Sequence, residues 1–143
     1  MSSQLNVDTI VDKSGSGGSN VKVANTSTYV SDGGAVTQNL VQGIAKFWSN
    51  HDGTGSSNDS YNQGSITDNG TGDFQLNFTN NMNNNDYSSN VSGSDANSNS
   101  TVILAVNDIN QFQTSSITHF VVSEDSGAQD VGPVCCTVHG DLA

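Results

Sequence analysis

Apolar and polar residues alternate along several short segments of the chain, which is the pattern of β-strands with one buried and one solvent-facing side. The clearest segment is 73–78, where Phe74, Leu76 and Phe78 alternate with polar residues. The segment 134–139 shows the same two-residue period. Short runs rich in β-branched and aromatic residues predict further strands at 45–49, 62–67, 87–91, 101–106 and 116–122.

Turn-forming residues separate these segments, and the strongest turn signal lies between 62–67 and 73–78. Residues 68–72 (DNGTG) contain Asn-Gly, the most favourable dipeptide for a tight hairpin because both residues tolerate a positive φ. Similar stretches rich in Asp, Ser and Gly occur at 52–55 and 123–128. Six to eight strands at this spacing predict an all-β domain, either an antiparallel sandwich or a small barrel.

The first 34 residues have a different pattern, with few apolar positions that could form a core. Short strands are expected at 4–11 and 21–23, separated by a joint rich in Gly and Ser. Because such an arm becomes ordered only by packing on another chain, we assign residues 1–34 to an attachment arm and 35–143 to the β domain. Four apolar residues at helical spacing permit one or two turns of helix, which could lie at a three-fold axis: Val36, Leu40, Val41 and Ile44.

Composition limits both the size of the core and the choice of partners. Only 32% of the residues are hydrophobic, below the ~45–50% of a typical domain, although that figure also counts glycine. We therefore expect identical copies to share part of the apolar burial. The formal net charge is -11, with three lysines and no arginine. This charge excludes binding to nucleic acid phosphates and argues against docking on anionic membranes.

Sequence motifs point neither to export nor to catalysis. The N-terminus lacks the basic and apolar regions of a secretory signal, and no run of about 18 apolar residues predicts membrane insertion. There is no nucleophile elbow, metalloprotease motif or phosphate-binding loop. An acid pair such as Asp125 and Asp130 could in principle cleave a polysaccharide, but no internal repeat predicts a groove-forming solenoid. We expect a protein that is not an enzyme and has no cofactor.

Several segments match motifs of a known family. Residues 46–55 (KFWSNHDGTG), 59–62 (DSYN) and 65–74 (SITDNGTGDF) resemble the opening part and the hairpin of the C-terminal domain of many bacteriophage tail-fibre proteins. The segments 82–87 and 134–141 are similar to its M-x-x-x-x-Y segment and its V-x-V-x-x-x-G-D ending. Residues 5–15 (LNVDTIVDKSG) also resemble the opening of fibre-like virion proteins common in marine phages. Ser49 and His51 depart from the family, which has apolar residues after its K-x-W opening.

The resemblance implies a homotrimer that is anchored to the particle by its N-terminal part and presents its C-terminal domain outward. On this interpretation the arm attaches to other virion proteins through Leu5, Val7, Ile10 and Val11. The core and the trimer contacts would use Phe47, Trp48, Phe74, Leu76, Phe78 and Val138.

Aromatic and amide side chains are the candidates for host recognition. Trp48 and Tyr61 could stack on sugar rings, although packing of Trp48 in the core or in a trimer seam is the simpler interpretation. The Asn-rich segments 80–86 and 95–100 could bind a glycan or be solvated loops without a ligand. The candidate receptor-binding residues are Tyr61, Tyr87, Asn83, Asn84, Asn85 and Asn97. A neutral glycan or a protein is easier to accommodate than an acidic polysaccharide, which needs screening of the charge repulsion.

No metal site is predicted from the sequence. The histidines could meet their symmetry mates at a three-fold axis, but an exposed or locally bonded state is the simpler expectation for His51, His119 and His139. The aspartates of the Gly-rich turns lack calcium-loop spacing and are expected to form turns instead: Asp52, Asp59, Asp68 and Asp73. The adjacent Cys135 and Cys136 are predicted to be unpaired thiols, because a vicinal disulfide is strained.

These observations favour a short, trimeric tail-fibre or adhesin subunit of a virus particle. A decoration or cement protein of the capsid or tail, without a receptor, is the alternative. A secreted carbohydrate-binding module of a cell is a third interpretation, which the N-terminal sequence does not favour.

Overall fold

The structure, a computed structural model, describes residues 27–30, 37–94, 102–105, 111–123 and 127–143. The predicted attachment residues Leu5, Val7, Ile10 and Val11 and the loop residue Asn97 lie outside these ranges. The chain divides into two compact units, residues 1–41 and 42–143. No helix within the described ranges is long and apolar enough to cross a membrane.

The described part of the first unit is a small antiparallel ribbon. Strand β1 (Thr28–Val30) pairs with β2 (Thr37–Asn39), and the N–H of Leu40 donates to the carbonyl of Ser27 over 2.9 Å. Helix α1 (Leu40–Gly43) follows at once. The helix expected within 35–44 is therefore a single turn, because residues 37–39 pair as a strand. A ribbon this short is marginal on its own, and Tyr29 and Val30 are at least half exposed.

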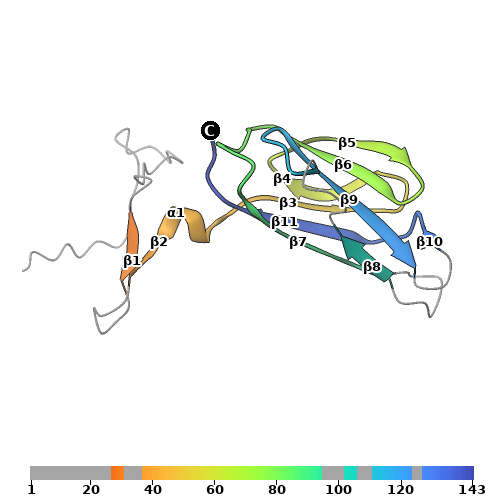
Figure 1. Cartoon of the computed structure of the whole chain (residues 1–143), viewed down its shortest axis with the longest axis horizontal. Helices are drawn as coiled ribbons and strands as arrows, with labels where there is room; N and C mark the ends of the chain where they lie inside the picture. The colour runs from red at the N-terminus through yellow and green to blue at the C-terminus, as the bar shows by residue number, and fades with distance from the viewer. Residues whose placement is uncertain (1–26, 31–36, 95–101, 106–110, 124–126) are drawn as a thin grey trace, which may run out of the picture. The chain divides into compact units, whose positions relative to one another are not determined.

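The second unit contains two antiparallel sheets (Figure 1). One sheet has four strands, in the order β4-β3-β11-β7. Its central strands pair along most of their length, with Phe47 opposite Val138 and His51 opposite Val134. Its members are β4 (Ser57–Tyr61), β3 (Ala45–His51), β11 (Val134–His139) and β7 (Ser88–Gly93).

The other sheet has the order β10-β9-β6-β5, with β8 also paired to β9. Strands β5 and β6 form a hairpin that turns at residues 71 and 72, within the predicted turn. The members of this sheet are β5 (Gln63–Gly70), β6 (Asp73–Phe78), β8 (Val102–Ala105), β9 (Ser116–Ser123) and β10 (Gly127–Ala128).

The core lies between the facing sides of the two sheets. Alternation along β6 turns Phe74, Leu76 and Phe78 inward, and all three are buried. They meet inward-facing residues of the other sheet, so that the rings of Phe47 and Phe78 lie 4.9 Å apart between centroids. Within the part of the chain that the structure describes, the remaining buried apolar residues are Met82, Tyr87, Ile117, Val121, Val134, Cys136 and Val138. The prediction of an antiparallel all-β domain is confirmed.

Asn62 holds the corner between β4 and β5. Its φ of 61° lies in the left-handed region, which asparagine tolerates better than most residues. Its side-chain amide donates to the carbonyls of Lys46 and Asn80, each over 3.0 Å, and its Oδ1 accepts from the N–H of Asn80 over 2.8 Å. One side chain therefore ties the corner to β3 and to the segment after β6.

We expect Asn62→Ala to lower the free energy of unfolding by about 3 kcal/mol, because it loses these hydrogen bonds and strains the backbone. Asn62→Gly should cost about 1–2 kcal/mol, since glycine adopts a positive φ without strain. Chemical denaturation measures both values, with the exposed Asn85→Ala as control. Equal costs for alanine and glycine would contradict a strained corner.

Candidate functional site

The outer face of the four-stranded sheet carries an exposed aromatic pair. Phe47, Ser49 and His51 of β3 point into the core and are buried, so Trp48 between them points outward. The strand register places Tyr61 directly opposite Trp48. Trp48 is 36% exposed and Tyr61 is 54% exposed. Two neighbouring strands therefore present adjacent aromatic rings on the same face.

The same register extends this pair into a row across the sheet. Thr137 of β11 lies opposite Trp48, and Asn90 of β7 lies opposite Thr137. We call Tyr61, Trp48, Thr137 and Asn90 the aromatic row. Placing Trp48 in the core of the domain was wrong: alternation turns it outward, although a role at a trimer seam stays a prediction.

A row of polar side chains runs beside the aromatic row. It consists of Asp59, Asn50, Cys135 and Ser92, one from each strand. The side-chain Oδ1 of Asn50 accepts from the side-chain amide of Asn58 over 2.8 Å, and the side-chain nitrogen of Asn50 lies 3.4 Å from the Cys135 sulfur. The amides beside the aromatic pair are thus held by neighbouring side chains.

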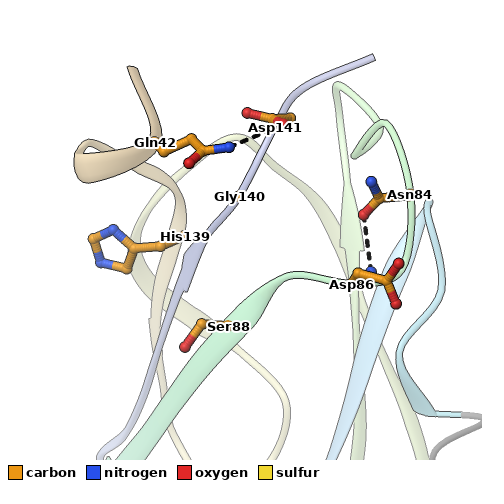
Figure 2. A pocket seen from close by; sticks show the side chains of 7 residues that line it. All are labelled: Gln42, Asn84, Asp86, Ser88, His139, Gly140 and Asp141. Atoms are coloured by element: carbon orange, nitrogen blue, oxygen red, sulfur yellow. Dashed lines mark hydrogen bonds between the residues drawn. The ribbon is translucent and has the colours of Figure 1, made fainter. Parts of the chain in front are cut away.

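A polar pocket of about 410 Å³ lies at the other side of the aromatic row. Figure 2 shows Ser88 and His139 projecting to the same side from β7 and β11, where they are opposite each other in register. Ser88 precedes Asn90 by two residues and His139 follows Thr137 by two, a step of about 7 Å along a strand. The pocket is lined by Gln42, Asn84, Asp86, Ser88, His139, Gly140 and Asp141.

Hydrogen bonds order two parts of the pocket wall (Figure 2). The Gln42 amide nitrogen donates to the Asp141 carboxylate over 3.4 Å, and the N–H of Asp86 donates to the Asn84 side-chain oxygen over 2.9 Å. Gly140 also lines the pocket. A side chain there would press on Tyr87, because a Cβ would lie 2.7 Å from the Tyr87 Cβ. Carboxylate, amide, hydroxyl and imidazole groups therefore surround a small polar space.

The structure separates the predicted receptor-binding residues. Tyr61 lies in the aromatic row, and Asn84 lines the pocket. Asn83 and Asn85 are exposed but do not line it. From the sequence, Asp86 was a candidate only as part of the Asn-rich segment 80–86, and His139 only as a metal ligand. Gln42, Ser88 and Asp141 were not candidates.

Tyr87 is a correction, because its side chain is buried in the core and not displayed. Its hydroxyl can donate to either of two backbone carbonyls, that of Gln113 at 3.0 Å or that of Ser116 at 2.9 Å. Burial raises the pKa of this phenol well above its usual range. The side chain fastens the segment before β9 and offers no surface to a ligand.

Two histidines form a buried pair, which corrects the expectation that they are exposed or bonded only locally. His51 of β3 and His119 of β9 are both fully buried, and their Nε2 atoms lie 3.2 Å apart. The His51 ring also packs against Phe74, with centroids 5.0 Å apart. His139, in contrast, is exposed.

The partners of the pair determine where its protons lie. The Nδ1 of His51 lies 2.7 Å from the carbonyl of Asp52, so it must carry a proton to donate. In the neutral ring the Nε2 of His51 then carries no proton, and its lone pair accepts from the Nε2–H of His119. The Nδ1 of His119 is buried without a hydrogen-bond partner. Burial lowers the pKa of His51 and lowers that of His119 to about 3.

The aspartates of the turns use their oxygens within the chain. The Asp52 Oδ1 accepts from the Thr54 hydroxyl and from the N–H groups of Thr54 and Ser56, all within 2.9 Å. These bonds, led by the Thr54 hydroxyl, lower the pKa of Asp52. Asp68 similarly accepts from the N–H of Gly70 over 2.9 Å. Within the described ranges, no three His, Cys, Asp or Glu side chains gather as metal ligands.

Both cysteines are free thiols. Cys136 faces the core and is buried, and burial raises its pKa to about 12. Cys135 belongs to the polar row on the outer face. The opposite orientations of the two side chains follow from their adjacent positions on one strand.

The segments from which a tail-fibre domain was predicted lie in the second unit. The K-x-W opening forms β3, the TDNGTGD sequence forms the β5–β6 hairpin, and the ending forms β11. Comparison of the chain with family models, with curated proteins and with solved structures found no match.

Proposed function

We propose that this protein is a short, trimeric fibre or adhesin subunit of a bacteriophage particle. Its arm, residues 1–34, would dock on other virion proteins, and its β domain would be displayed for host-surface binding. The observation that carries the proposal is the exposed Trp48–Tyr61 pair on the outer face of a regular sheet. Rigid aromatic side chains on a stable scaffold are typical of recognition surfaces.

Two further observations support an assembly of identical copies. Apolar side chains remain exposed in the described part of the first unit, among them Tyr29, Val30 and Leu40. The low hydrophobic content of the chain also favours shared burial. In a trimer, three weak contacts would act together and gain affinity from their effective concentration.

The proposal predicts a trimer at micromolar concentration in multi-angle light scattering. It also predicts that the purified protein competes with phage for adsorption to host cells. A version lacking residues 1–34 should still compete but should not enter particles. A stable monomer would contradict the trimer. Labelling of the protein on capsid faces, without any effect on adsorption, would instead favour the decoration or cement role.

A further inference from the structure

We propose that the outer face of the four-stranded sheet binds an uncharged oligosaccharide, with one sugar on the aromatic row and the next over the polar pocket. This inference rests on the proposed function, in which the β domain is displayed to a host surface. It specifies the chemical class of the ligand and the residues that would hold it.

The aromatic row offers a subsite for one face of a pyranose ring. The C–H groups of that face pack on aromatic rings, whereas its hydroxyls need polar partners at the edge. Trp48 and Tyr61 lie opposite each other on adjacent strands, which are about 4.8 Å apart. Asn50 and Thr137 adjoin them, so hydrogen-bonding groups border the aromatic surface.

The pocket offers a second subsite, for hydroxyl groups. The Asp86 and Asp141 carboxylates can accept hydrogen bonds from them, and the Ser88 hydroxyl and the His139 imidazole can donate or accept. Ser88 and His139 lie one step of alternation, about 7 Å, from Asn90 and Thr137 of the aromatic row. The two subsites are close enough for neighbouring sugars of one chain.

The charge of the face selects an uncharged ligand. Asp59 borders the aromatic row, and two carboxylates line the pocket. The chain has no arginine, and the Lys46 ammonium, which donates to the carbonyl of Ile44 over 2.6 Å, offsets part of the charge of Asp141 only. Sulfates or uronic acids would be repelled here, whereas neutral hydroxyls gain charge-assisted hydrogen bonds to carboxylates. The same repulsion disfavours another copy of this acidic chain as the occupant.

Trp48 is the only tryptophan of the chain, so its fluorescence reports directly on the proposed site. The full-length protein is titrated with neutral mono- and tetrasaccharides of glucose, galactose, mannose and N-acetylglucosamine. Uronate-containing and sulfated tetrasaccharides serve as acidic probes. We expect at least one neutral tetrasaccharide to shift the Trp48 emission with saturation, and the acidic probes to bind at least tenfold more weakly.

Variants separate the two subsites. Tyr61→Ala should weaken the binding of both mono- and tetrasaccharide about tenfold, while Asp86→Asn should weaken the tetrasaccharide severalfold and leave the monosaccharide unchanged. Thr71→Ala, at an exposed position in the β5–β6 turn of the other sheet, is the control and should have no effect. Thermal unfolding must show that each variant is folded.

The inference is overturned if no neutral sugar changes the emission, if acidic probes bind equally well, or if Tyr61→Ala binds like the wild type. It is also overturned if the emission shifts only on trimer formation, because the face is then a seam between copies. Loss of sugar binding alone, with adsorption still blocked by the protein, leaves the fibre role standing. Sugar binding by a protein that is absent from particles overturns the fibre role instead.

Discussion

The free energy of unfolding is expected to fall as the pH is lowered from about 6.5, and to keep falling toward pH 3. The buried pair His51–His119 causes this loss. Both side chains are neutral in the folded domain, with the pKa of His119 lowered to about 3 from the usual 6.5. Between these values the unfolded chain binds more protons than the folded chain. The free energy of unfolding therefore rises with pH through this window, and above it the contribution of the pair is fully present.

The geometry explains why the folded pair resists protonation. A proton added to the Nε2 of His51 would point at the Nε2–H of His119, only 3.2 Å away. A proton added to the Nδ1 of His119 would find no acceptor. The nearest carboxylate in sequence, Asp52, turns its backbone carbonyl to His51 and uses its Oδ1 in its own turn. Burial therefore opposes the charge on His51 more strongly than the Asp52 carbonyl and the Asp52 carboxylate favour it.

Each proton bound only by the unfolded chain contributes about 1.4 kcal/mol per pH unit, so one histidine costs about 3 kcal/mol at pH 4.5. Urea unfolding at several pH values between 7 and 4 measures this slope. His119→Gln should flatten it, because an amide can still donate to His51 but does not titrate. The control Asn85→Ala, at an exposed position without a titratable group, should leave the slope unchanged.

A His119→Gln protein with the slope of the wild type would contradict this account. So would a domain whose stability is constant between pH 7 and 4. Below about pH 4, Asp52 adds to the loss in the same direction, because its pKa is lowered in the folded state. The histidine contribution is therefore best isolated between pH 6.5 and 4.5.

The strands that alternation defines were predictable, and for a clear physical reason. In β6 and β11 the inward residues are all apolar, so the sequence itself specifies the bounds 73–78 and 134–139 that the structure has. Strand β4 was not predicted, because Ser57–Tyr61 contains one apolar residue only, and that residue faces outward. Strand β4 forms because it pairs with β3, and the residue pattern of 57–61 alone contains no sign of that pairing.

The wrong placements of Trp48 and Tyr87 have a different cause from the failure to predict the histidine pair. Strand β3 continues two residues beyond the predicted end at Ser49, and this extension turns His51 inward. Continuing the alternation from Phe47 would have placed Trp48 outside and His51 inside. The contact with His119 could not be predicted in this way, because it joins strands of different sheets 68 residues apart. Tyr87 directly precedes β7, and continuing the alternation of the predicted strand back from Val91 through Ser89 would have placed Tyr87 inside.

A second large effect is expected at Gly72, in the turn between β5 and β6. Its φ is +71°, and a Cβ there would lie 2.4 Å from the carbonyl oxygen of Val121. The Gly72 carbonyl also accepts from the N–H of Val121 over 2.8 Å, and its own N–H donates to the Asp130 carboxylate over 2.7 Å. Close approach of the turn to β9 therefore requires a residue without a side chain.

We expect Gly72→Ala to lower the free energy of unfolding by about 4 kcal/mol, because backbone strain and a steric clash with backbone add together. Two other glycines separate these causes. Gly70 has a positive φ of +136° but nothing within 4 Å of a Cβ, so Gly70→Ala should cost only the strain, about 1–2 kcal/mol. Gly43 has neither feature, and Gly43→Ala should change stability by less than about 0.5 kcal/mol.

Urea unfolding at pH 7, where the histidine pair contributes fully, measures all three variants on one scale. If Gly72→Ala cost no more than Gly70→Ala, the turn would not be pressed against Val121, and the clash would play no part. If Gly72→Ala cost several times more than Gly70→Ala, close backbone contact between the hairpin and β9 must contribute to stability. The second glycine of the sequence TDNGTGD would then be required for this contact between strands, since a turn alone requires only the positive φ that Asn can also adopt.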